Sequence, residues 1–592
     1  MSVALSLIKR IDLNWLTGPI FDKELRVSSR RRRNYWLRFC YVAILGFIMT
    51  VFWIEQISYR GSFAYQVSRM AELGIQVTCF LVWFQFIASQ LIAIVMLSSS
   101  ISGEIHHRTL GVLMTTPINA LQIVLGKLLS KTWQLLLLIA ISLPLLAIVR
   151  LFGGIPWGFL LRALTLTFTS ILFVGSLSLL YSIYFRKAYS VIIVTVITLG
   201  VLYGLFPLLT VLAAEGKLIS QNTVEPMLFY LNPFFALGLI TENAVSPGRF
   251  GWVGLTSRWL AHCGVFLGSA VLLIGLAVVR VRAVALKQIA GTRSTPRKTS
   301  PHVTQSVSSS GPKRSFRPIK GCPVRWRECR TPLLGRHKWA VMIVVLLLLI
   351  PLAIIYGAIV KSKFANFDEE GIHMAFLTVY MGLGMLFTIV IPATAITSEK
   401  ERRSWPVLLG TLAGDGNILW AKCIGALRGC ALAWIPTLAH AVVFVLLGFI
   451  HALALIGLLL VIASTLVFHI GSGLYFSSVT KRTTSAVVLN FILPAVLWFF
   501  IPMVLAMSSE LMRMGDELTE MYADFIPFVQ MISLVDGGVP ARFGQPLEFN
   551  GPHMHLYGGA VFLFLGVSTL LYGGIAGVFA WRAKARFRKN IF

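Results

Sequence analysis

Two short polar segments interrupt an otherwise apolar sequence, and each places a carboxylate four residues before a guanidinium. The first polar segment, ISGEIHHRTLGVL, carries Glu104 and Arg108. The second polar segment, ITSEKERRSWPVL, carries Glu399 and Arg403. On a helix each pair shares one face in the favourable order, which stabilises the helix by about 0.2–0.5 kcal/mol. Because so small an energy does not account for the pattern occurring twice, we expect two short helices that display charge to a soluble partner.

Other residue patterns that perform catalysis or bind metals are sparse. His106 and His107 are adjacent, so on a helix their rings point apart, and the second polar segment has Glu401 in place of His106. Seven cysteines without a C-x-x-C spacing give neither a disulfide framework nor a zinc pattern. The sequence has no G-x-x-x-x-G-K-[ST] pattern to cradle a phosphate, and no soluble stretch long enough for an ATPase. We expect no catalytic, cofactor-binding or metal-binding residues in this chain.

The composition predicts a multi-span membrane protein. Of 592 residues, 57% are hydrophobic and only 13% are charged, against roughly 25% charged in soluble domains. Apolar runs of about 20 residues recur, long enough to cross a bilayer as helices. We expect an all-α polytopic fold with about 12 transmembrane helices. They are placed at 39–57, 74–98, 132–149, 163–185, 189–213, 259–280, 339–360, 373–397, 427–450, 453–478, 485–507 and 556–580.

The basic residues predict which side of the membrane each connection occupies. Lys and Arg gather in alternate connections and in the tail RAKARFRKN, whereas acidic loops such as FDEEG fill the others. By the positive-inside rule the basic connections are cytoplasmic, which places both termini and both polar segments on that side. Arg150 and Arg162 are exceptions, and each lies near a span end from which its side chain can reach the interface. The net charge of +29 therefore indicates topology and not nucleic-acid binding.

The second half of the chain repeats the first in order. At an offset of 295 residues the two Glu–Arg pairs align, and so do Lys127 and Lys422. GPIFDKELR aligns with CPVRWRECR, and NPF at 232–234 lies opposite IPF at 526–528. Each half would hold six spans, an even number, so the halves are parallel repeats about an axis along the membrane normal. In transporters such repeats place a pathway between them.

The repeat predicts three parts along the chain. A first six-span domain occupies 1–282, a flexible basic linker 283–321, and a second six-span domain 322–592. Ser, Thr, Pro and basic residues dominate the linker, so we expect disorder there. Anionic membrane lipid attracts such a segment by about 1 kcal/mol for each basic residue.

A short segment before the first span of each half has the order of an amphipathic helix. Proline suits the first turn, and early acids with later bases complement the helix dipole. We expect each segment to lie in the inner membrane interface. The aligned residues are Pro19, Glu24, Arg26, Pro323, Glu328 and Arg330.

Three of these features together resemble the permeases of type-two ATP-binding-cassette (ABC) exporters. They are the E-x-x-x-[RK]-[TS] segment after span two, the G-K entering span three and the P-x-x-x-K-E-L-R start before span one. The resemblance covers nearly the whole chain, as two six-span permease domains fused in tandem. It implies that the segment before span one is an elbow helix, and that each polar segment is a coupling helix resting in a groove of an ATPase. The implied docking residues are Glu104, Arg108, Thr109, Glu399, Arg403 and Ser404.

The same resemblance implies broken, re-entrant helices on the outer side before span six. LFYLNPFFALGLI (228–240) and DFIPFVQMISLV (524–535) are similar to these, being apolar, interrupted by proline and too short to span. An outer gate is therefore expected at Asn232, Pro233, Phe234, Pro527 and Phe528. The second half departs from the family pattern at Trp405-Pro406, so its coupling helix is expected to be shorter or asymmetric.

The resemblance implies the permease subunit of an ATP-driven exporter, located in the cell membrane, and on this resemblance in a bacterial inner membrane. ATP and magnesium would bind to separate ATP-binding subunits, two copies of which dock on the coupling helices, so the chain itself is no enzyme. Few polar groups line the spans, which favours a hydrophobic or amphipathic substrate over a small ion.

Two other functional classes remain open from the residues alone. An ion-coupled secondary transporter needs ionisable groups within the membrane; no Asp or Glu lies well inside the expected spans, which leaves His440 and His469. A membrane-embedded enzyme needs a cluster of catalytic groups, and FDEEGIH offers paired carboxylates near His373, but on the outer surface. ATPase activity stimulated by this chain would separate a transporter from both, and from a purely structural protein.

Overall fold

The protein is an all-α polytopic membrane protein. Nine helices in the described residues are long and apolar enough to cross a membrane, or up to ten if one sharply bent pair counts as a single span. One two-stranded antiparallel hairpin accompanies them in the same residues. The computed structural model describes residues 14–30, 32–57, 63–106, 109–113, 115–152, 156–185, 188–215, 220–245, 252–292, 322–330, 356–357, 370–512, 516–539 and 546–588.

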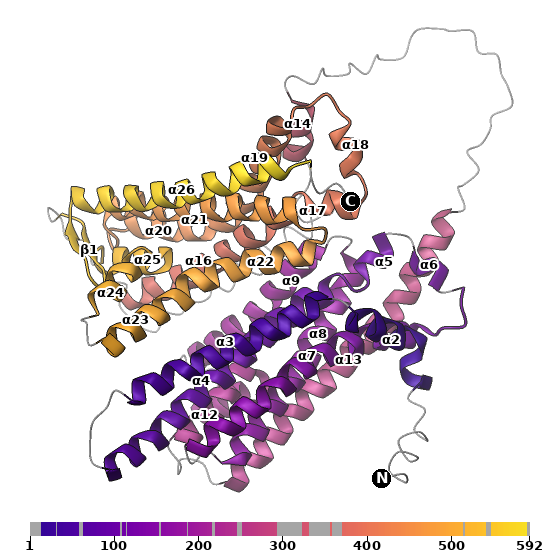
Figure 1. Ribbon diagram of the computed structural model, residues 1–592, viewed down its shortest axis with the longest axis horizontal. Helices are drawn as coiled ribbons and strands as arrows, with labels where there is room; N and C mark the ends of the chain where they lie inside the picture. Colours follow the sequence, from indigo (N-terminus) through magenta and orange to yellow (C-terminus); the bar gives the residue numbers. More distant parts are fainter. Residues whose placement is uncertain are drawn as a thin grey trace.

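The first half forms one bundle, drawn in indigo to pink in Figure 1. Its span five is interrupted by one turn of π-helix at Val201–Leu205. The elements are α2 (Asn14–Ser29), α3 (Arg32–Ile57), α4 (Phe63–Ser98), α5 (Ser102–His106), α6 (Thr109–Leu113), α7 (Ala120–Phe152), α8 (Trp157–Tyr184), α9 (Ala188–Gly200), α10 (Phe206–Glu215), α11 (Gln221–Leu231), α12 (Pro233–Val245) and α13 (Trp252–Thr292).

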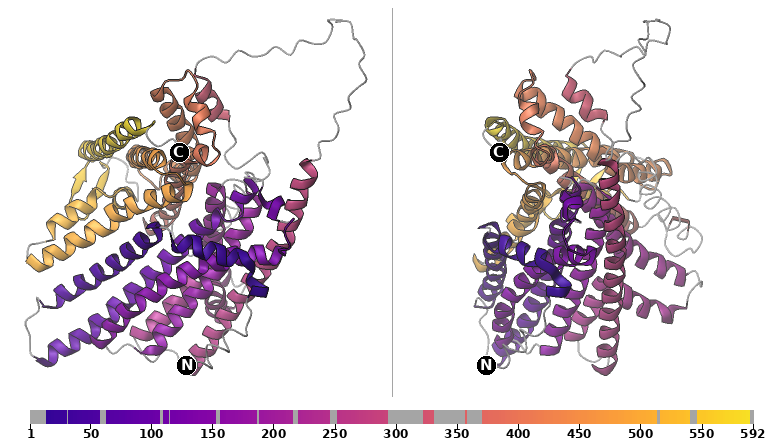
Figure 2. Two further views of the ribbon diagram at one scale, coloured as in Figure 1. Left: turned by 45° about the vertical axis from the view of Figure 1, so that its right-hand side comes forward. Right: turned by 90° about the vertical axis from the view of Figure 1, so that its right-hand side faces the viewer.

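The second half forms a similar bundle beside the first, in orange to yellow (Figures 1 and 2). Its span five has a π-helical turn at Val496–Phe500. The elements are α14 (Pro323–Arg330), α16 (Glu370–Thr394), α17 (Thr397–Glu401), α18 (Trp405–Leu409), α19 (Asp415–Ala431), α20 (Ile435–Leu446), α21 (Ala452–Val479), α22 (Thr483–Ala495), α23 (Ile501–Met512), α24 (Glu517–Asp524), α25 (Pro527–Asp536), β1 (Glu548–Asn550), β2 (His555–Tyr557) and α26 (Gly559–Arg586).

Within each half the same spans pack together. The fourth span lies against the sixth, as α8 against α13 and α21 against α26, and the second lies against the fourth, as α4 against α8 and α16 against α21. Gly471 of α21 lets the last pair approach closely, since a Cβ there would lie 2.8 Å from backbone atoms of Ala576 in α26. Equivalent packing in both bundles is what a tandem duplication predicts.

The two halves meet through reciprocal pairs of helices. Span two of each half packs against span five of the other, as α4 against α22 and α16 against α9. Leu97 and Ile193 of the first half share one apolar core with Val390 and Val487 of the second. This reciprocity relates the halves by an approximate two-fold axis, as expected for parallel repeats.

Nine of the expected spans coincide with helices long enough to cross a membrane. The expected spans at 39–57 and 189–213 are helical, but their described apolar parts, Arg38–Phe47 and Ala188–Gly204, are shorter than a span. Most of the one expected at 339–360 lies outside the described residues. Span six of the first half continues as helix to Thr292, ten residues into the segment predicted as linker.

Candidate functional site

Each polar segment contains two short helices, α5 and α6 in the first and α17 and α18 in the second, at the same end of the two bundles (Figure 1). Residues 402–404 form a break between the two helices of the second segment. In the second segment Arg403 lies in this break, exposed and with φ at +56°. The predicted helical pairing of Glu399 with Arg403 is therefore wrong, because the helix has already ended at Glu401. The expectation that the second coupling helix is shorter or asymmetric stays a prediction, because residues 107–108 and 114, beside the helices of the first copy, lie outside the described residues. Arg108 lies outside the described residues.

The first ionic network joins the first polar segment to span three. Lys127 of α7 is buried and extends its Nζ to Oε1 of Glu104, 3.0 Å away. The same Nζ donates to the backbone oxygen of Ser100 at 2.9 Å. The hydroxyl of Thr109 in α6 donates to the other carboxylate oxygen of Glu104 in α5. Glu104 thus holds the segment together and fixes it to α7.

The second ionic network repeats this arrangement with more partners. Lys422 of α19 places Nζ 3.1 Å from Oε1 of Glu399, and the hydroxyl of Ser404 donates to Oε2. Arg327 donates to Glu399 at 2.6 Å, and Glu328 lies 2.8 Å from Lys422. Both carboxylates therefore share one lysine that is only 3% exposed.

The predicted interfacial helices supply part of these networks. α2 packs against α7 and α14 against α19. A kink at Gly18, with φ at +62°, sets the helix that starts at Pro19 apart from the turn before it. Glu24 lies 3.3 Å from Lys131 of α7, one helical turn after Lys127, whereas Glu328 reaches Lys422, the residue that aligns with Lys127.

The remaining expected elbow residues lie at the surface. Pro19 and Arg26 are exposed, Pro323 starts α14, and the guanidinium of Arg330 lies 4.6 Å from the ring centre of Trp326. Sequence reasoning aligned Lys127 with Lys422 but gave them no role. The signal was the lysine itself, which recurs at the same offset, although the Gly126 before Lys127 is replaced by Ala421 before Lys422.

The networks lower the pKa of the two central carboxyl groups. Burial alone would raise the pKa of Glu399, but Lys422, Ser404 and Arg327 together hold it at about 2. Burial likewise opposes a lower pKa at Glu104, and Lys127 and Thr109 outweigh it. Both carboxylates are therefore ionised at neutral pH and held by internal partners.

Acid is expected to weaken the second ionic network. The folded pKa of Glu399 lies below its ordinary value of 4.5, so the stabilisation is complete above about pH 4.5 and is lost as the pH falls towards 2. The measurement is the difference in melting temperature between the wild type and Glu399→Gln, which should shrink across that range. A difference that stays constant down to about pH 2.5 would contradict the assignment.

Span six packs against the polar segment in both halves. Leu110 of α6 is fully buried in the core that includes Val281 of α13. In the second half Trp405 is buried with its ring 4.9 Å from that of Phe587, and Arg588 donates two hydrogen bonds of 2.8 and 3.1 Å to Oδ1 of Asp415. Each segment is thus fixed on its inner side by spans three and six.

The outer side of each segment exposes an apolar residue at the same offset. Val112 of α6 is 66% exposed and Val407 of α18 is 73% exposed, and neither belongs to the ionic networks. We call these two residues and the short helices that carry them the exposed valine surfaces. They are better placed to meet another protein than Glu104 and Glu399, whose carboxylates are engaged inside the chain.

The expected broken helices lie at the opposite end of the bundles (Figure 1). The chain bends by 107° between Asn222–Leu231 and Pro233–Val245. Asn232 sits at the bend, where its Oδ1 accepts hydrogen bonds from the backbone N–H groups of Phe234 at 2.9 Å and Phe235 at 3.3 Å. In the second half Pro527 begins the short apolar helix α25, with Phe528 in its first turn. The break predicted within 228–240 is confirmed as a bend between two helices, and the re-entrant course and the outer gate stay predictions.

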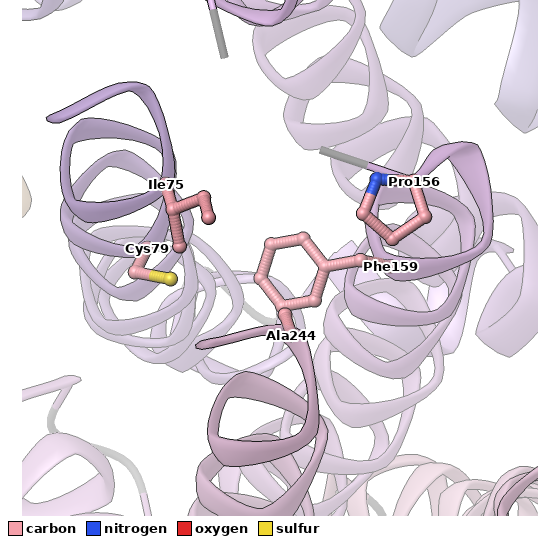
Figure 3. Close-up of a pocket in the computed structure, with 5 residues that line it drawn as sticks. All are labelled: Ile75, Cys79, Pro156, Phe159 and Ala244. Carbon is pink, nitrogen blue, oxygen red and sulfur yellow. The ribbon is translucent and has the colours of Figure 1, made fainter. Parts of the chain in front are cut away.

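One hollow near this end is lined by apolar side chains. Figure 3 shows the ring of Phe159 between α4 and α12, with four neighbours around it. The hollow has no room for a water molecule, so it is a packing defect rather than a binding site. The lining residues are Ile75, Cys79, Pro156, Phe159 and Ala244.

The histidines considered for ion coupling are hydrogen-bonded within the bundle. Nε2 of His440 lies 3.2 Å from Nδ1 of His373, and Nδ1 of His440 is hydrogen-bonded to the hydroxyl of Tyr356. Nδ1 of His469 lies 2.8 Å from the backbone oxygen of Thr465. Over the described ranges no three His, Cys, Asp or Glu residues gather closely enough to hold a metal ion. These contacts fit packing roles for the three histidines.

Comparison with known proteins identifies a family. A family model described as ABC-2 family transporter protein matches residues 19–283 and again 322–581. The two matches cover most of the chain and fall on the two halves of the repeat. No curated protein and no solved structure matches the chain.

Proposed function

The chain belongs to the ABC-2 family of transporter proteins as two fused permease domains, and on that premise we propose that it is the permease of an ATP-driven exporter whose two polar segments each seat a separate ATP-binding subunit. The chain is a permease subunit of an ABC transporter and a multi-pass membrane protein. The proposal extends this to its motor, its orientation and its direction. The polar segments would face the cytoplasm, with the protein in the cell membrane and its termini cytoplasmic.

The observation that carries the proposal is the duplicated polar segment. Each copy is fixed to span three by a buried lysine, Lys127 or Lys422, and to span six by apolar packing. A force applied to α6 or α18 would therefore move a whole bundle and not a loose loop. A docked motor needs such a rigid connection.

The transport cycle follows from this connection. ATP binding would draw two ATP-binding subunits together and pull the two polar segments with them, and hydrolysis would release them. The bundles would rock about the contacts of α4 with α22 and of α9 with α16. ATP and magnesium would bind on the partner subunits, so the permease itself needs no ATPase site. Export of a hydrophobic or amphipathic substrate fits the apolar composition of the chain, of which 57% is hydrophobic.

The contact with the motor is expected to centre on the exposed valine surfaces. Val112→Asp and Val407→Asp each place a charge on an apolar contact, which should weaken docking by at least about tenfold. A tagged chain purified from membranes that contain its ATP-binding subunit should retain one copy when one site is changed, and none when both are. The readout is ATPase activity and subunit stoichiometry in the purified complex.

The control is Val245→Asp, which changes an exposed valine at the outer end of α12. It should leave the bound ATPase unchanged. If the double variant keeps its melting temperature and still carries the full ATPase activity, the motor does not dock on these surfaces.

A further inference from the structure

Span five of each half contains a π-helical turn at an aligned position. The turns are Val201–Leu205 and Val496–Phe500, whose starts are separated by the 295 residues that separate the two polar segments. A proline follows each turn, Pro207 in the first half and Pro502 in the second. Isolated π-helical turns are rare, and they occur mostly at functional positions. Two of them at matched positions call for a physical cause.

The prolines and the wider turns together leave backbone carbonyl groups without helical partners. Phe206 and Ile501 donate their N–H groups five residues back, to the oxygens of Val201 and Val496. The oxygen of Tyr203 would normally bond to the N–H at position 207, but proline has none. The oxygen of Leu497 loses its normal donor, Ile501, to Val496. Buried carbonyl groups of this kind need another donor.

The outer broken helices supply that donor in both halves. Nδ2 of Asn232 donates to the oxygen of Tyr203 at 2.8 Å. The hydroxyl of Tyr522, in α24, donates to the oxygen of Leu497, also at 2.8 Å. Different side chains thus make the same connection, from the outer broken helix to the π-helical turn of span five.

Span six holds the same broken helices from the other side. Nδ1 of His262 lies 2.7 Å from the oxygen of Phe229, at the end of α11. The hydroxyl of Tyr572 donates to the oxygen of Phe525 at 2.9 Å, between α24 and α25. Each broken helix is therefore held by side-chain hydrogen bonds to span five on one side and to span six on the other.

The second π-helical turn also lies next to the contact between the two halves. The ring of Phe500, the last residue of the second turn, lies 4.7 Å from the ring of Phe47 in α3 of the first half. The helix beyond it, α23, packs against α3. A movement of one half against the other would therefore act on this turn.

We propose that the two π-helical turns are hinges that link movement of one half against the other to release of the outer broken helices, with Asn232 and Tyr522 as the positioning residues. The inference rests on the proposed function, since it assigns the hinges a place in the transport cycle. Returning a π-helical turn to α-helix rotates the helix beyond it by about 100° and shifts it by about 1.5 Å. The carbonyl group would then find a backbone donor or turn away, and the broken helix would lose its anchor. The turn thus has two discrete arrangements, as a switch requires.

The test is hydrogen exchange of the broken helices in the full chain in lipid nanodiscs. Tyr522→Phe removes one hydroxyl, and Asn232→Ser keeps an oxygen to cap α12 but is too short to reach Tyr203. Each should raise amide exchange in its own broken helix by about tenfold, the effect of losing one hydrogen bond to a buried carbonyl. Thr241→Val is the control, since it removes the bond from Trp83 to the same α12 without touching the π-helical turn.

A second arm separates a hinge from a merely structural bond. In the complex with ATP-binding subunits, trapping with ADP and vanadate should change exchange in the broken helices of the wild type and of Thr241→Val. Tyr522→Phe and Asn232→Ser should abolish that change, and Pro502→Ala, which restores an N–H to span five, should abolish it in α24 and α25.

The two arms fail in different ways. If no ATP-binding subunit associates with the chain, the proposed function fails, while the first arm still measures the anchors. If Tyr522→Phe and Asn232→Ser exchange as the wild type does, and respond to trapping as it does, the hinge assignment is wrong whatever the motor.

Discussion

Replacing Lys422 by methionine is expected to cost about 3–5 kcal/mol of folding free energy and to release α14 and α17 from α19. The ammonium group of Lys422 lies 2.8 Å from a carboxylate oxygen of Glu328 and 3.1 Å from one of Glu399, and its side chain is 3% exposed. Without it two carboxylates face each other in a largely buried site. Arg327 would be left to neutralise both, and its side chain is 45% exposed.

The measurement is the yield and melting temperature of the purified variant. Lys127→Met is the matched comparison and should cost less, because Lys127 neutralises Glu104 alone while Glu24 has Lys131. Neutralising the acids should rescue Lys422→Met, so the triple variant with Glu328→Gln and Glu399→Gln should melt close to the wild type. Should Lys422→Met melt as the wild type does, the second ionic network contributes no stability and this account of it is wrong.

Gly471→Ala is expected to destabilise the second half by about 3 kcal/mol or more, although it adds a single methyl group. The new carbon would lie 2.8 Å from Cα, Cβ and O of Ala576. Because two of these are backbone atoms of α26, no side chain can rotate aside. The spans α21 and α26, which pack against each other, would have to separate along their contact.

Gly275→Ala provides the opposite expectation. Gly275 lies in α13 with nothing within 4 Å of its would-be Cβ, so alanine should stabilise the helix by about 0.5–1 kcal/mol. The two variants should therefore shift the melting temperature in opposite directions. Equal shifts would mean that the close approach at Gly471 does not limit packing.

The helical fold and the repeat could be predicted because each depends on patterns that are visible in the sequence itself. Apolar length locates a span, and the 295-residue offset aligned Lys127 with Lys422 before any contact was known. The partners of Glu399 could not be predicted in this way. Its expected partner, Arg403, was chosen from helical spacing, and the left-handed backbone that ends the helix falls on an arginine, where no glycine marks it.

For the outer broken helices, too, one feature could be predicted from the sequence and another could not. Proline in an apolar run too short to span predicted the break at Asn232, and the 107° bend confirms it. The anchor to span five was not predicted, because it joins Asn232 to a residue 29 positions earlier through a carbonyl group that carries no sequence signal of its own. The repeated proline at 207 and 502 was the available sign.

The covalent fusion of the halves removes a constraint that acts on permeases assembled from identical chains. In such a dimer any substitution enters both sides of the axis at once. Here His373 and His440 form a buried pair in the second half, while the aligned positions in the first hold Thr78 and Leu145. One gene can therefore vary the two halves independently, so the contacts on one side of the approximate two-fold axis need not be matched on the other.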